Sequence, residues 1–340
     1  MGSKLPIETE NPLFGLVLYP TAKDIMEHQQ DIGWTSQEIP VFKDEHDYRF
    51  NLSSPQLNSA TITLQTFVEI EQKVGEVWAT IARWYPHSEI QMCCKEISRM
   101  EECVHAPFYQ KMSDVLNIAP EETFKNQQTI VELKNKLELL NSITKDLEKD
   151  KLLSLATVAL IEQVLLFSNF AVLKSNSSNG NNFISNTITG VDFVIADEQL
   201  HGDFATFLYI THKSEHNKYI GELPKTHLES ILTVVEEIIN HEDSMIDYIF
   251  KGETSINSIT PEQLKEFIRS RANQVLENFG YKSYYVNTEN PIANWFYKGT
   301  KSIKVHDFFS GLTNQYRRGW ELDSFSRLPL LNKENINGTN

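Results

Sequence analysis

The chain has 340 residues, of which 40% are hydrophobic and 23% charged, and its formal net charge is −15. This composition supports a substantial globular core. The acidic balance argues against a nucleic-acid-binding protein, because neutralising phosphate needs a surplus of Lys and Arg. The length fits one large domain or two ordinary ones.

The three cysteines indicate a reducing compartment. Cys93, Cys94 and Cys103 lie close together within one helical pattern and lack the spacing of a disulfide framework. The N-terminal residues Met1–Pro6 lack the apolar core of a signal peptide. No stretch reaches the ~18 to 20 apolar residues that a membrane span requires. We therefore expect a cytoplasmic protein that does not associate with a membrane.

Helical periodicity dominates the chain. Apolar spacing and turn residues predict helices over residues 21–33, 54–84, 88–117, 119–145, 148–174, 189–214, 224–250 and 261–279. The helix over 148–174 is largely apolar and is therefore expected in the core. Gly280 is the expected C′ cap of the last helix. The predicted fold is all-α, with an N-terminal extension (1–20), one helical domain (21–315) and a C-terminal tail (316–340).

Two Glu-x-x-His pairs carry the chemistry, Glu102–His105 and Glu198–His201. On an α-helix, residues three apart lie on one face, so each pair can aim a carboxylate and an imidazole at one point. Two such helices, with one further Glu from each of two others, build the dinuclear metal site of ferritin-like four-helix bundles. The pattern predicts such a site in a four-helix core.

Glu71 and Glu162 are the expected additional carboxylates. Glu71 lies on the apolar row of helix 54–84, whereas Glu69 lies on its polar row. Glu162 is flanked by apolar residues, and a buried carboxylate is costly unless it is paired or binds metal. The predicted ligands are Glu71, Glu102, His105, Glu162, Glu198 and His201. Carboxylates with one imidazole per metal suit iron or manganese better than zinc.

Two further residues lie next to the predicted ligands. Tyr109 follows His105 by four residues and shares its helix face, so its phenol could lose an electron and a proton to an oxidant at the metals. An ordinary core tyrosine is the alternative. Asp197 points about 100° away from Glu198 and could hydrogen-bond the distal nitrogen of a ligand histidine.

These residues resemble the radical-generating small (beta) subunit of class I ribonucleotide reductase. The resemblance covers roughly residues 20–320, and it rests on Glu102–Tyr109, Leu160–Gln163 followed by Leu166 and Phe170, Asp197–His201, Trp34–Ile39 and Asn314–Arg318. The spacing between Glu71 and Glu102 also matches that family and supports Glu71 as the first ligand.

The resemblance implies an enzyme subunit of ribonucleoside-diphosphate reductase. Reduced metals on the six ligands would react with oxygen or a reduced oxygen species and oxidise Tyr109. The stored radical would be shielded by Leu166, Phe170 and Val194.

The resemblance also implies a path and a partner. The oxidising equivalent would travel through Trp34, coupled to Asp197 and His105, and then through Tyr316. Its destination would be a cysteine of a separate large (alpha) subunit, where ribonucleotides are reduced to deoxyribonucleotides. A homodimer is implied as well.

Three departures from the family leave details open. Most members have Asp where this chain has Glu71, and the manganese/iron members that share the Glu usually lack the tyrosine. The centre is therefore two irons, manganese with iron, or two manganese ions, and with manganese the metals themselves could hold the oxidant. The segment from Glu162 to Glu198 is about two residues longer than usual. The C-terminus lacks the usual acidic and aromatic ending, so Phe325 or Leu328–Leu331 is the expected docking segment for the large subunit.

Two other functions fit a metal-binding bundle. A ferritin-like ligand-binding oxidase or hydroxylase would have no use for Trp34 or Tyr316. A metal-storage or structural bundle would need no tyrosine beside the metals. The joint presence of Trp34, Tyr109 and Tyr316 favours the reductase subunit.

Overall fold

The computed structural model describes residues 5–10, 16–178 and 180–297. Over these residues the fold is helical, and the only β-type pairing is an isolated bridge between Ile256 and Ile259. The α-helices are α1 (Pro20–Asp31), α2 (Ser54–Ile81), α3 (Ser88–Met100), α4 (Ala106–Val115), α5 (Pro120–Thr129), α6 (Val131–Ile143), α7 (Lys151–Leu160), α8 (Phe167–Ser175), α9 (Ser185–Tyr219), α10 (Lys225–Phe250), α11 (Pro261–Asn278) and α12 (Pro291–Phe296). Two 3₁₀ turns, η1 (Pro6–Glu8) and η2 (Val41–Asp44), and three π-turns, η3 (Asp47–Asn51), η4 (Glu101–His105) and η5 (Ile161–Leu165), complete the list.

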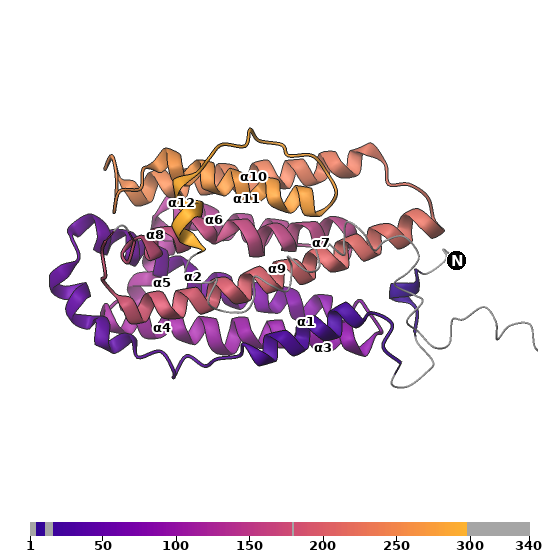
Figure 1. Cartoon of the computed structure of the whole chain (residues 1–340), viewed down its shortest axis with the longest axis horizontal. Coiled ribbons are helices and arrows are strands. Elements are labelled where there is room, and N and C mark those ends of the chain that lie inside the picture. The colour runs from indigo at the N-terminus through magenta and orange to yellow at the C-terminus, as the bar shows by residue number, and fades with distance from the viewer. Residues whose placement is uncertain (1–4, 11–15, 179, 298–340) are drawn as a thin grey trace, which may run out of the picture.

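The predicted all-α, ferritin-like bundle is confirmed. α2, the run α3–η4–α4, the run α7–η5–α8 and α9 pack against one another as the four-helix core. α1 packs on α3 and α9, while α10 and α11 cover the side formed by α6, α7 and η5. In Figure 1 these long helices lie nearly parallel to the long axis of the molecule.

The predicted helices differ from the observed ones in three places. The helix expected over 119–145 is wrong as a single element, because Ile130 adopts an extended conformation (φ −83°, ψ 114°) between α5 and α6. The short helix α12 was not predicted. The runs over 88–117 and 148–174 are each interrupted by a π-turn, which an α-helical pattern does not reveal.

The apolar run Lys151–Ser175 is buried in the centre of the bundle. Contrary to the expectation from sequence, this helix is long and apolar enough to cross a membrane, and it is the one such helix among the described residues. Its most apolar window lies entirely inside the fold. Its composition is explained by neighbouring helices on all sides, as for a core helix.

Gly280 ends α11 as predicted. Its φ of +84° lies in the left-handed region, which glycine adopts without a steric penalty. Its N–H donates to the carbonyl of Glu277, and the N–H of Tyr281 donates to the carbonyl of Leu276. These two bonds form a Schellman motif, which satisfies carbonyls that the helix end leaves free.

A carboxylate from a distant turn caps α9, the helix that carries Glu198 and His201. Asp44 is buried and accepts hydrogen bonds from the backbone N–H groups of Thr187 (2.6 Å) and Asn186 (3.3 Å). Asp47 accepts from the N–H of Ile184, which has a positive φ of 49°. A negative charge at a helix N-terminus satisfies free donors and complements the helix dipole.

We predict that Asp44→Ala lowers the free energy of unfolding by about 1–2 kcal/mol, because it removes a buried cap from α9. Urea denaturation followed by circular dichroism measures this change. The control is Asp24→Ala, at an exposed position of α1, which should change stability by less than about 0.5 kcal/mol. Equal stabilities of the two variants would contradict the capping role.

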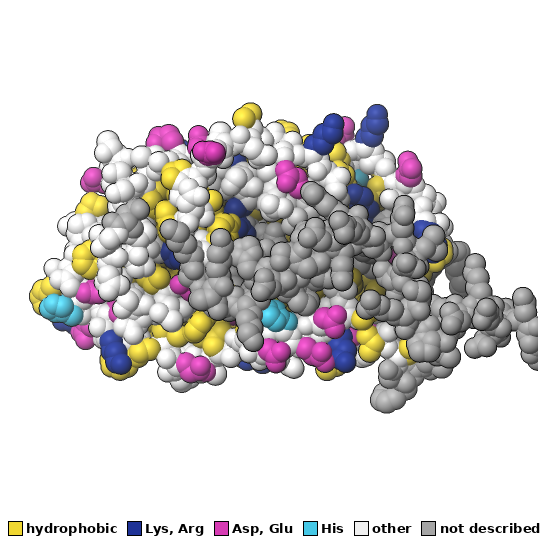
Figure 2. Space-filling model, in the orientation of Figure 1, with side chains coloured by type: hydrophobic (Ala, Val, Ile, Leu, Met, Phe, Trp, Pro, Cys, Tyr) yellow, Lys and Arg dark blue, Asp and Glu magenta, His cyan; other side chains and the backbone are white. Residues whose placement is uncertain are grey.

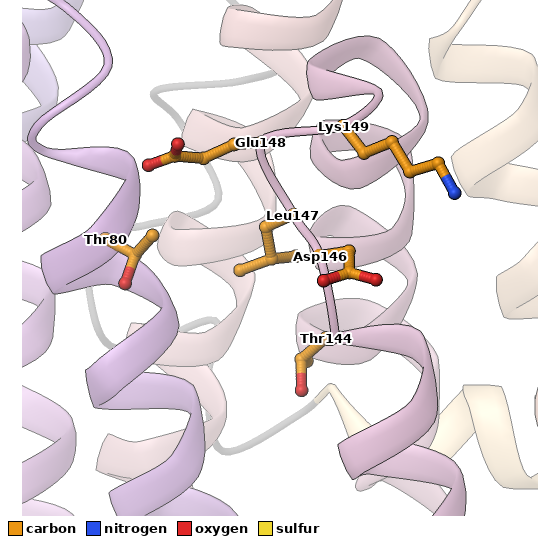
Figure 3. A pocket seen from close by; sticks show the side chains of 6 residues that line it. All are labelled: Thr80, Thr144, Asp146, Leu147, Glu148 and Lys149. Carbon is orange, nitrogen blue, oxygen red and sulfur yellow. The ribbon is translucent and has the colours of Figure 1, made fainter.

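The visible surface is mixed in charge. On the face in Figure 2, acidic and basic side chains are interspersed over the described residues. A depression of about 600 Å³ lies between the end of α2 and the loop from α6 to α7. It is lined by Thr80, Thr144 and residues 146–149, as Figure 3 shows, and so it lies apart from the residues of the predicted metal site.

Candidate metal centre

Six charged or ionisable side chains meet in the core of the four-helix bundle. Each is at most 1% exposed. α2 supplies Glu71, the π-turn η4 supplies Glu101 and His105, the π-turn η5 supplies Glu162, and α9 supplies Glu198 and His201.

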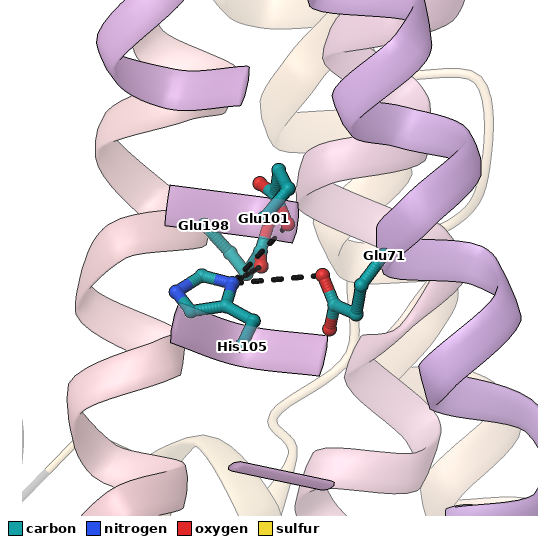
Figure 4. Close-up of side chains that lie close together, drawn as sticks. All are labelled: Glu71, Glu101, His105 and Glu198. Carbon is teal, nitrogen blue, oxygen red and sulfur yellow. Dashed lines mark hydrogen bonds and ion pairs between the residues drawn. The ribbon is translucent and has the colours of Figure 1, made fainter. Parts of the chain in front are cut away.

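The six side chains form two overlapping groups of metal-ligand type. Glu71 and His105 belong to one group, Glu162 and His201 to the other, and Glu101 and Glu198 to both. Within each group one ligand atom per residue lies within 4.8 Å of every other. Because two carboxylates are shared, the six side chains could hold two cations, with Glu101 and Glu198 available to both. Figure 4 shows the first group with His105 facing the three carboxylates.

His105 is oriented by carboxylates on both ring nitrogens. Its Nδ1 lies 3.2 Å from Glu101 Oε2, 3.2 Å from Glu198 Oε1 and 3.5 Å from Glu71 Oε2. Its Nε2 lies 3.0 Å from Asp197 Oδ2. In metal sites, the ring nitrogen of a ligand histidine that faces away from the metal commonly donates a hydrogen bond to a carboxylate, which fixes the orientation of the ring.

Many ligand atoms of the cluster lack a hydrogen bond. His201 Nδ1 lies 2.7 Å from Glu101 Oε1, yet neither atom has a hydrogen-bond partner in the described part of the chain. The same holds for Glu71 Oε1, Glu162 Oε2, both oxygens of Glu198 and His201 Nε2. Buried polar atoms are normally paired. Unpaired atoms that converge in this way fit a pair of cations, and oxygen donors with one imidazole each suit iron or manganese.

Burial and crowding shift the pKa values of the carboxylates in opposite directions. Burial, followed by the charges of Glu101 and Glu198, raises the pKa of Glu71. Burial and the same two neighbours raise the pKa of Glu162. Burial opposes ionisation of Glu101 and Glu198 too, but the adjacent histidines overcome it and lower both pKa values.

The pKa values of the two histidines are raised, whereas those of Glu101 and Glu198 are lowered. Burial lowers the pKa of His201, but the Glu101 carboxylate more than offsets it and raises the value to about 9. The pKa of His105 is likewise raised by Glu101 and Asp197 against the effect of burial. Cations bound here would compensate the same carboxylate charges, and metal binding to such groups releases protons.

Glu102 does not belong to the cluster, which corrects the sequence prediction. Its side chain is exposed and accepts a hydrogen bond from Ser98. Its stem lies against Gly75, where an added Cβ would come within 2.6 Å of Glu102 Cγ. Glu101, four residues before His105, occupies the predicted place.

The reason for this exchange is the π-turn at Glu101–His105. The prediction assumed a regular α-helix, in which positions three and four before His105 both lie near its face. A π-turn contains more residues per turn and changes which of the two points inward. The predicted pair Glu198–His201 lies in the regular helix α9, and both of its members are in the cluster. The prediction of Glu71 over Glu69 also agrees with the structure, because Glu71 is buried and Glu69 is exposed.

Trp34 and Asp197 lie beside His105. The Trp34 Nε1–H donates to Asp197 Oδ2 (2.8 Å), the same oxygen that lies next to His105. The indole stacks on the His105 ring at 6.0 Å between centroids. Gln29, which sequence reasoning missed, donates to Asp197 Oδ1 (2.8 Å) and fixes the carboxylate from the other side.

Tyr109 is completely buried on the same helical run as His105. Its ring packs on Phe67 at 4.5 Å and on Phe108 at 5.2 Å, and Phe67 in turn contacts Phe170. The hydroxyl has no hydrogen-bond partner among the described residues. Burial, followed by the charge of Glu71, raises its pKa, so the phenol is protonated in a dry pocket near the cluster. Leu166 and Val194, the other predicted shielding residues, are also buried.

Trp78, on α2, is a second indole at the cluster. Its Nε1–H donates to Glu162 Oε1, and its ring stacks on Phe204 at 5.6 Å. Glu162 is thereby held with Oε2 free. Tyr316, Phe325 and Leu328–Leu331, the predicted transfer and docking residues, lie outside the described residues.

Comparisons with known proteins show which family this sequence matches. The family model of the ribonucleotide reductase small chain matches residues 16–291. A probable ribonucleoside-diphosphate reductase small subunit of Invertebrate iridescent virus 3 is 23% identical over 88% of this chain and 82% of its own length.

Two solved structures share the fold. The dimanganese(II) NrdF of Streptococcus sanguinis matches with a TM-score of 0.70 and 20% identity, covering 86% of this chain and 99% of that one. The Rnr4 homodimer subunit of Saccharomyces cerevisiae matches with a TM-score of 0.70 and 17% identity, covering 89% and 92%.

We predict that Glu101→Gln weakens metal binding by more than roughly tenfold, because Glu101 belongs to both ligand groups. Glu102→Gln is the matched control, one residue away, and should bind metal like the wild type. Titration of the apo-protein with Mn(II), with bound metal quantified by mass spectrometry, measures both. Loss of binding in Glu102→Gln with retention in Glu101→Gln would assign the ligand to Glu102 instead.

We also predict that Trp78→Phe weakens binding at the Glu162–His201 position by roughly tenfold, because Glu162 loses the donor that orients it. The control is Trp84→Phe. Trp84 is buried, but its Nε1 has no hydrogen-bond partner among the described residues, so the substitution removes no such contact. The same titration distinguishes the two variants. Identical metal affinities of Trp78→Phe and Trp84→Phe would contradict a role for Trp78 in orienting Glu162.

Proposed function

Because the chain belongs to the ribonucleotide reductase small chain family, we propose that it is the radical-generating small subunit of ribonucleoside-diphosphate reductase. It holds an oxidising equivalent and delivers it to a large subunit, which reduces ribonucleotides to deoxyribonucleotides. The observation that carries the proposal is the buried ligand cluster with Tyr109 beside it and a Trp34–Asp197–His105 chain leading from it.

We assign the metal ligands by their grouping. Glu71 and His105 would hold the first metal and Glu162 and His201 the second, while Glu101 and Glu198 would be available to both. The bound metal pair supplies the oxidising power for the reaction. The donor set suits two irons, manganese with iron, or two manganese ions. The manganese form of the Streptococcus sanguinis relative supports including manganese.

Tyr109 is the proposed store of the oxidising equivalent. Oxidation of its phenol removes one electron and the hydroxyl proton. Glu71 is the proposed acceptor of that proton in the metal-bound protein, because among the carboxylates its charge acts most strongly on Tyr109 and its Oε1 has no hydrogen-bond partner within the described chain. The aromatic wall of Phe67 and Phe108 keeps water and reductants from the ring.

Trp34 is the proposed exit from the cluster. Its indole N–H is hydrogen-bonded to Asp197, so the proton can stay close to the ring as the electron moves. Gln29 keeps Asp197 in the orientation that faces both Trp34 and His105. Tyr316 in the C-terminal tail would continue the path to the large subunit.

The proposed partners are the large subunit and a second copy of this chain. Residues 316–340 would form the tail that docks the large subunit, through Phe325 or Leu328–Leu331. The homodimeric yeast relative supports self-association. The expected compartment is the cytoplasm, and no nucleic-acid or membrane partner is proposed. The oxidase alternative gains no support from the depression in Figure 3, whose lining includes no residue of the cluster.

The proposal is tested by reconstituting the apo-protein with Fe(II), Mn(II) or both, adding oxygen, and recording electron paramagnetic resonance spectra. We expect a tyrosyl radical in at least one metal form, and deoxyribonucleotide formation when the cognate large subunit is added. Tyr109→Phe should lose the radical signal and reduce turnover to background, because the oxidised side chain is missing.

Two further variants make the experiment specific. Tyr85→Phe changes another buried tyrosine, hydrogen-bonded to His212, and should keep the signal. Tyr316→Phe should keep the stored signal but lose turnover, which separates storage from delivery. Full activity of Tyr109→Phe would show that the metals hold the oxidant, and absence of turnover in every metal form of the wild type would refute the reductase assignment.

A further inference from the structure

Arg271 contacts the two elements that carry Glu162 and Glu198 but belongs to neither ligand group. It is buried on α11, with only 7% of its surface exposed. Its guanidinium lies 3.3 Å from the ring centroid of Phe167, the residue that begins α8. A buried arginine away from the ligands needs an explanation, because removing a charge from water is costly unless it is fully paired.

The guanidinium connects the residues that follow two ligands. Its Nε–H donates to the main-chain carbonyl of Gln163, within the π-turn η5. One terminal N–H donates to the side-chain oxygen of Gln199 at 3.4 Å, and the other to the hydroxyl of Tyr297. Gln163 directly follows Glu162, and Gln199 directly follows Glu198. One planar group therefore touches both elements.

Asp203 closes the network from the opposite end. Its Oδ1 accepts hydrogen bonds from the amide of Gln163 (2.9 Å) and from the amide of Gln199 (3.3 Å). Asp203 lies on α9 two residues after His201. Gly202 makes room for this contact, because a Cβ there would come within 2.2 Å of Gln163 Cγ.

We propose that Arg271, with Gln163, Gln199 and Asp203, is a clamp that sets the position of Glu162 relative to Glu198 and His201. Arg271 is thus a positioning residue for the second metal, and the inference rests on the proposed metal-binding function. The π-turn η5 is where such support is needed, since a π-turn is a less regular backbone segment than the α-helix around it. Metal ligands must be held to within a fraction of an ångström, and supporting residues commonly change metal affinity by 10–100-fold.

The clamp does not hold Glu71 and His105, the two ligands that belong to the first group alone, although Glu198 is common to both groups. Glu71 comes from α2 and His105 from η4, and the hydrogen bonds of Arg271 reach neither element. Loss of Arg271 should therefore weaken metal binding at the Glu162–His201 position and leave the affinity at the Glu71–His105 position close to normal.

The test is a titration of the full-length apo-protein with Mn(II), in which the free-ion signal in electron paramagnetic resonance reports two binding steps. Arg271→Met, which keeps the apolar stem but has no donors, should weaken one step by roughly tenfold or more and leave the other within about twofold. Arg271→Lys, which keeps the charge but not the planar fork, should weaken the same step less.

The matched control is Arg269→Met on the same helix. Arg269 forms an ion pair with Asp243 and contacts neither Gln163 nor Gln199, so both binding steps should match the wild type. If Arg271→Met does not fold by circular dichroism, the Arg271→Lys comparison decides.

The possible failures are distinguishable. Two unchanged binding steps in a folded Arg271 variant overturn the clamp, as does equal weakening of both steps. Failure of the wild type to bind two ions would instead overturn the proposed metal-binding function.

Discussion

The constraint on which the structure depends is the burial of four carboxylates and two imidazoles at one point in an apolar core. Each ionised group taken out of water carries a penalty of several kcal/mol unless it is paired and hydrogen-bonded. The helices satisfy their own backbone groups, but much of the cluster's side-chain bonding capacity stays unused among the described residues. The negative charge of the buried carboxylates must therefore be compensated within the site, by protons or by bound cations. Burial in this core is the largest cause of the raised pKa of both Glu162, which lies within the apolar run Lys151–Ser175, and Tyr109.

Regular helices are predictable from sequence because their pattern depends on local geometry. Periodicity identified the bundle, selected Glu71 over Glu69, and paired Glu198 with His201 in α9. It named Glu102 and did not consider Glu101, although three- and four-residue spacings are nearly equivalent on an α-helix. What decides between them is the π-turn η4 and the space that Gly75 leaves for the Glu102 stem, and these are contacts between helices. The break at Ile130 likewise depends on packing that no local pattern records.

The residues that orient the ligands were missed for a related reason. Gln29 lies 168 residues from Asp197, Trp78 lies 84 residues from Glu162, and Arg271 lies 108 residues from Gln163. Each of the three residues lies on a helix whose local sequence pattern predicts which face is buried but not which residues that face contacts. A ligand motif has a spacing that can be recognised, whereas its supporting shell is assembled from whichever helices happen to pack there. Buried polar side chains on otherwise apolar faces were the one signal available, and they do not name their partners.

The two indoles at the cluster differ in a way that bears on the direction of transfer. Trp78 donates its N–H to Glu162, itself a candidate ligand, and is fully buried against Phe204. Trp34 donates to Asp197, which lies next to the far nitrogen of His105, and 5% of Trp34 is exposed. Oxidation of Trp78, or loss of its hydrogen bond, would disturb the candidate ligand Glu162 directly. Its contact with Glu162 therefore suits a role in orienting that carboxylate. At Trp34 the neighbouring group is the carboxylate of Asp197, which is also held in place by a hydrogen bond from Gln29. This contrast supports the proposed exit through Trp34, the indole that is one hydrogen bond further from the ligands, because a change in its charge would displace them less.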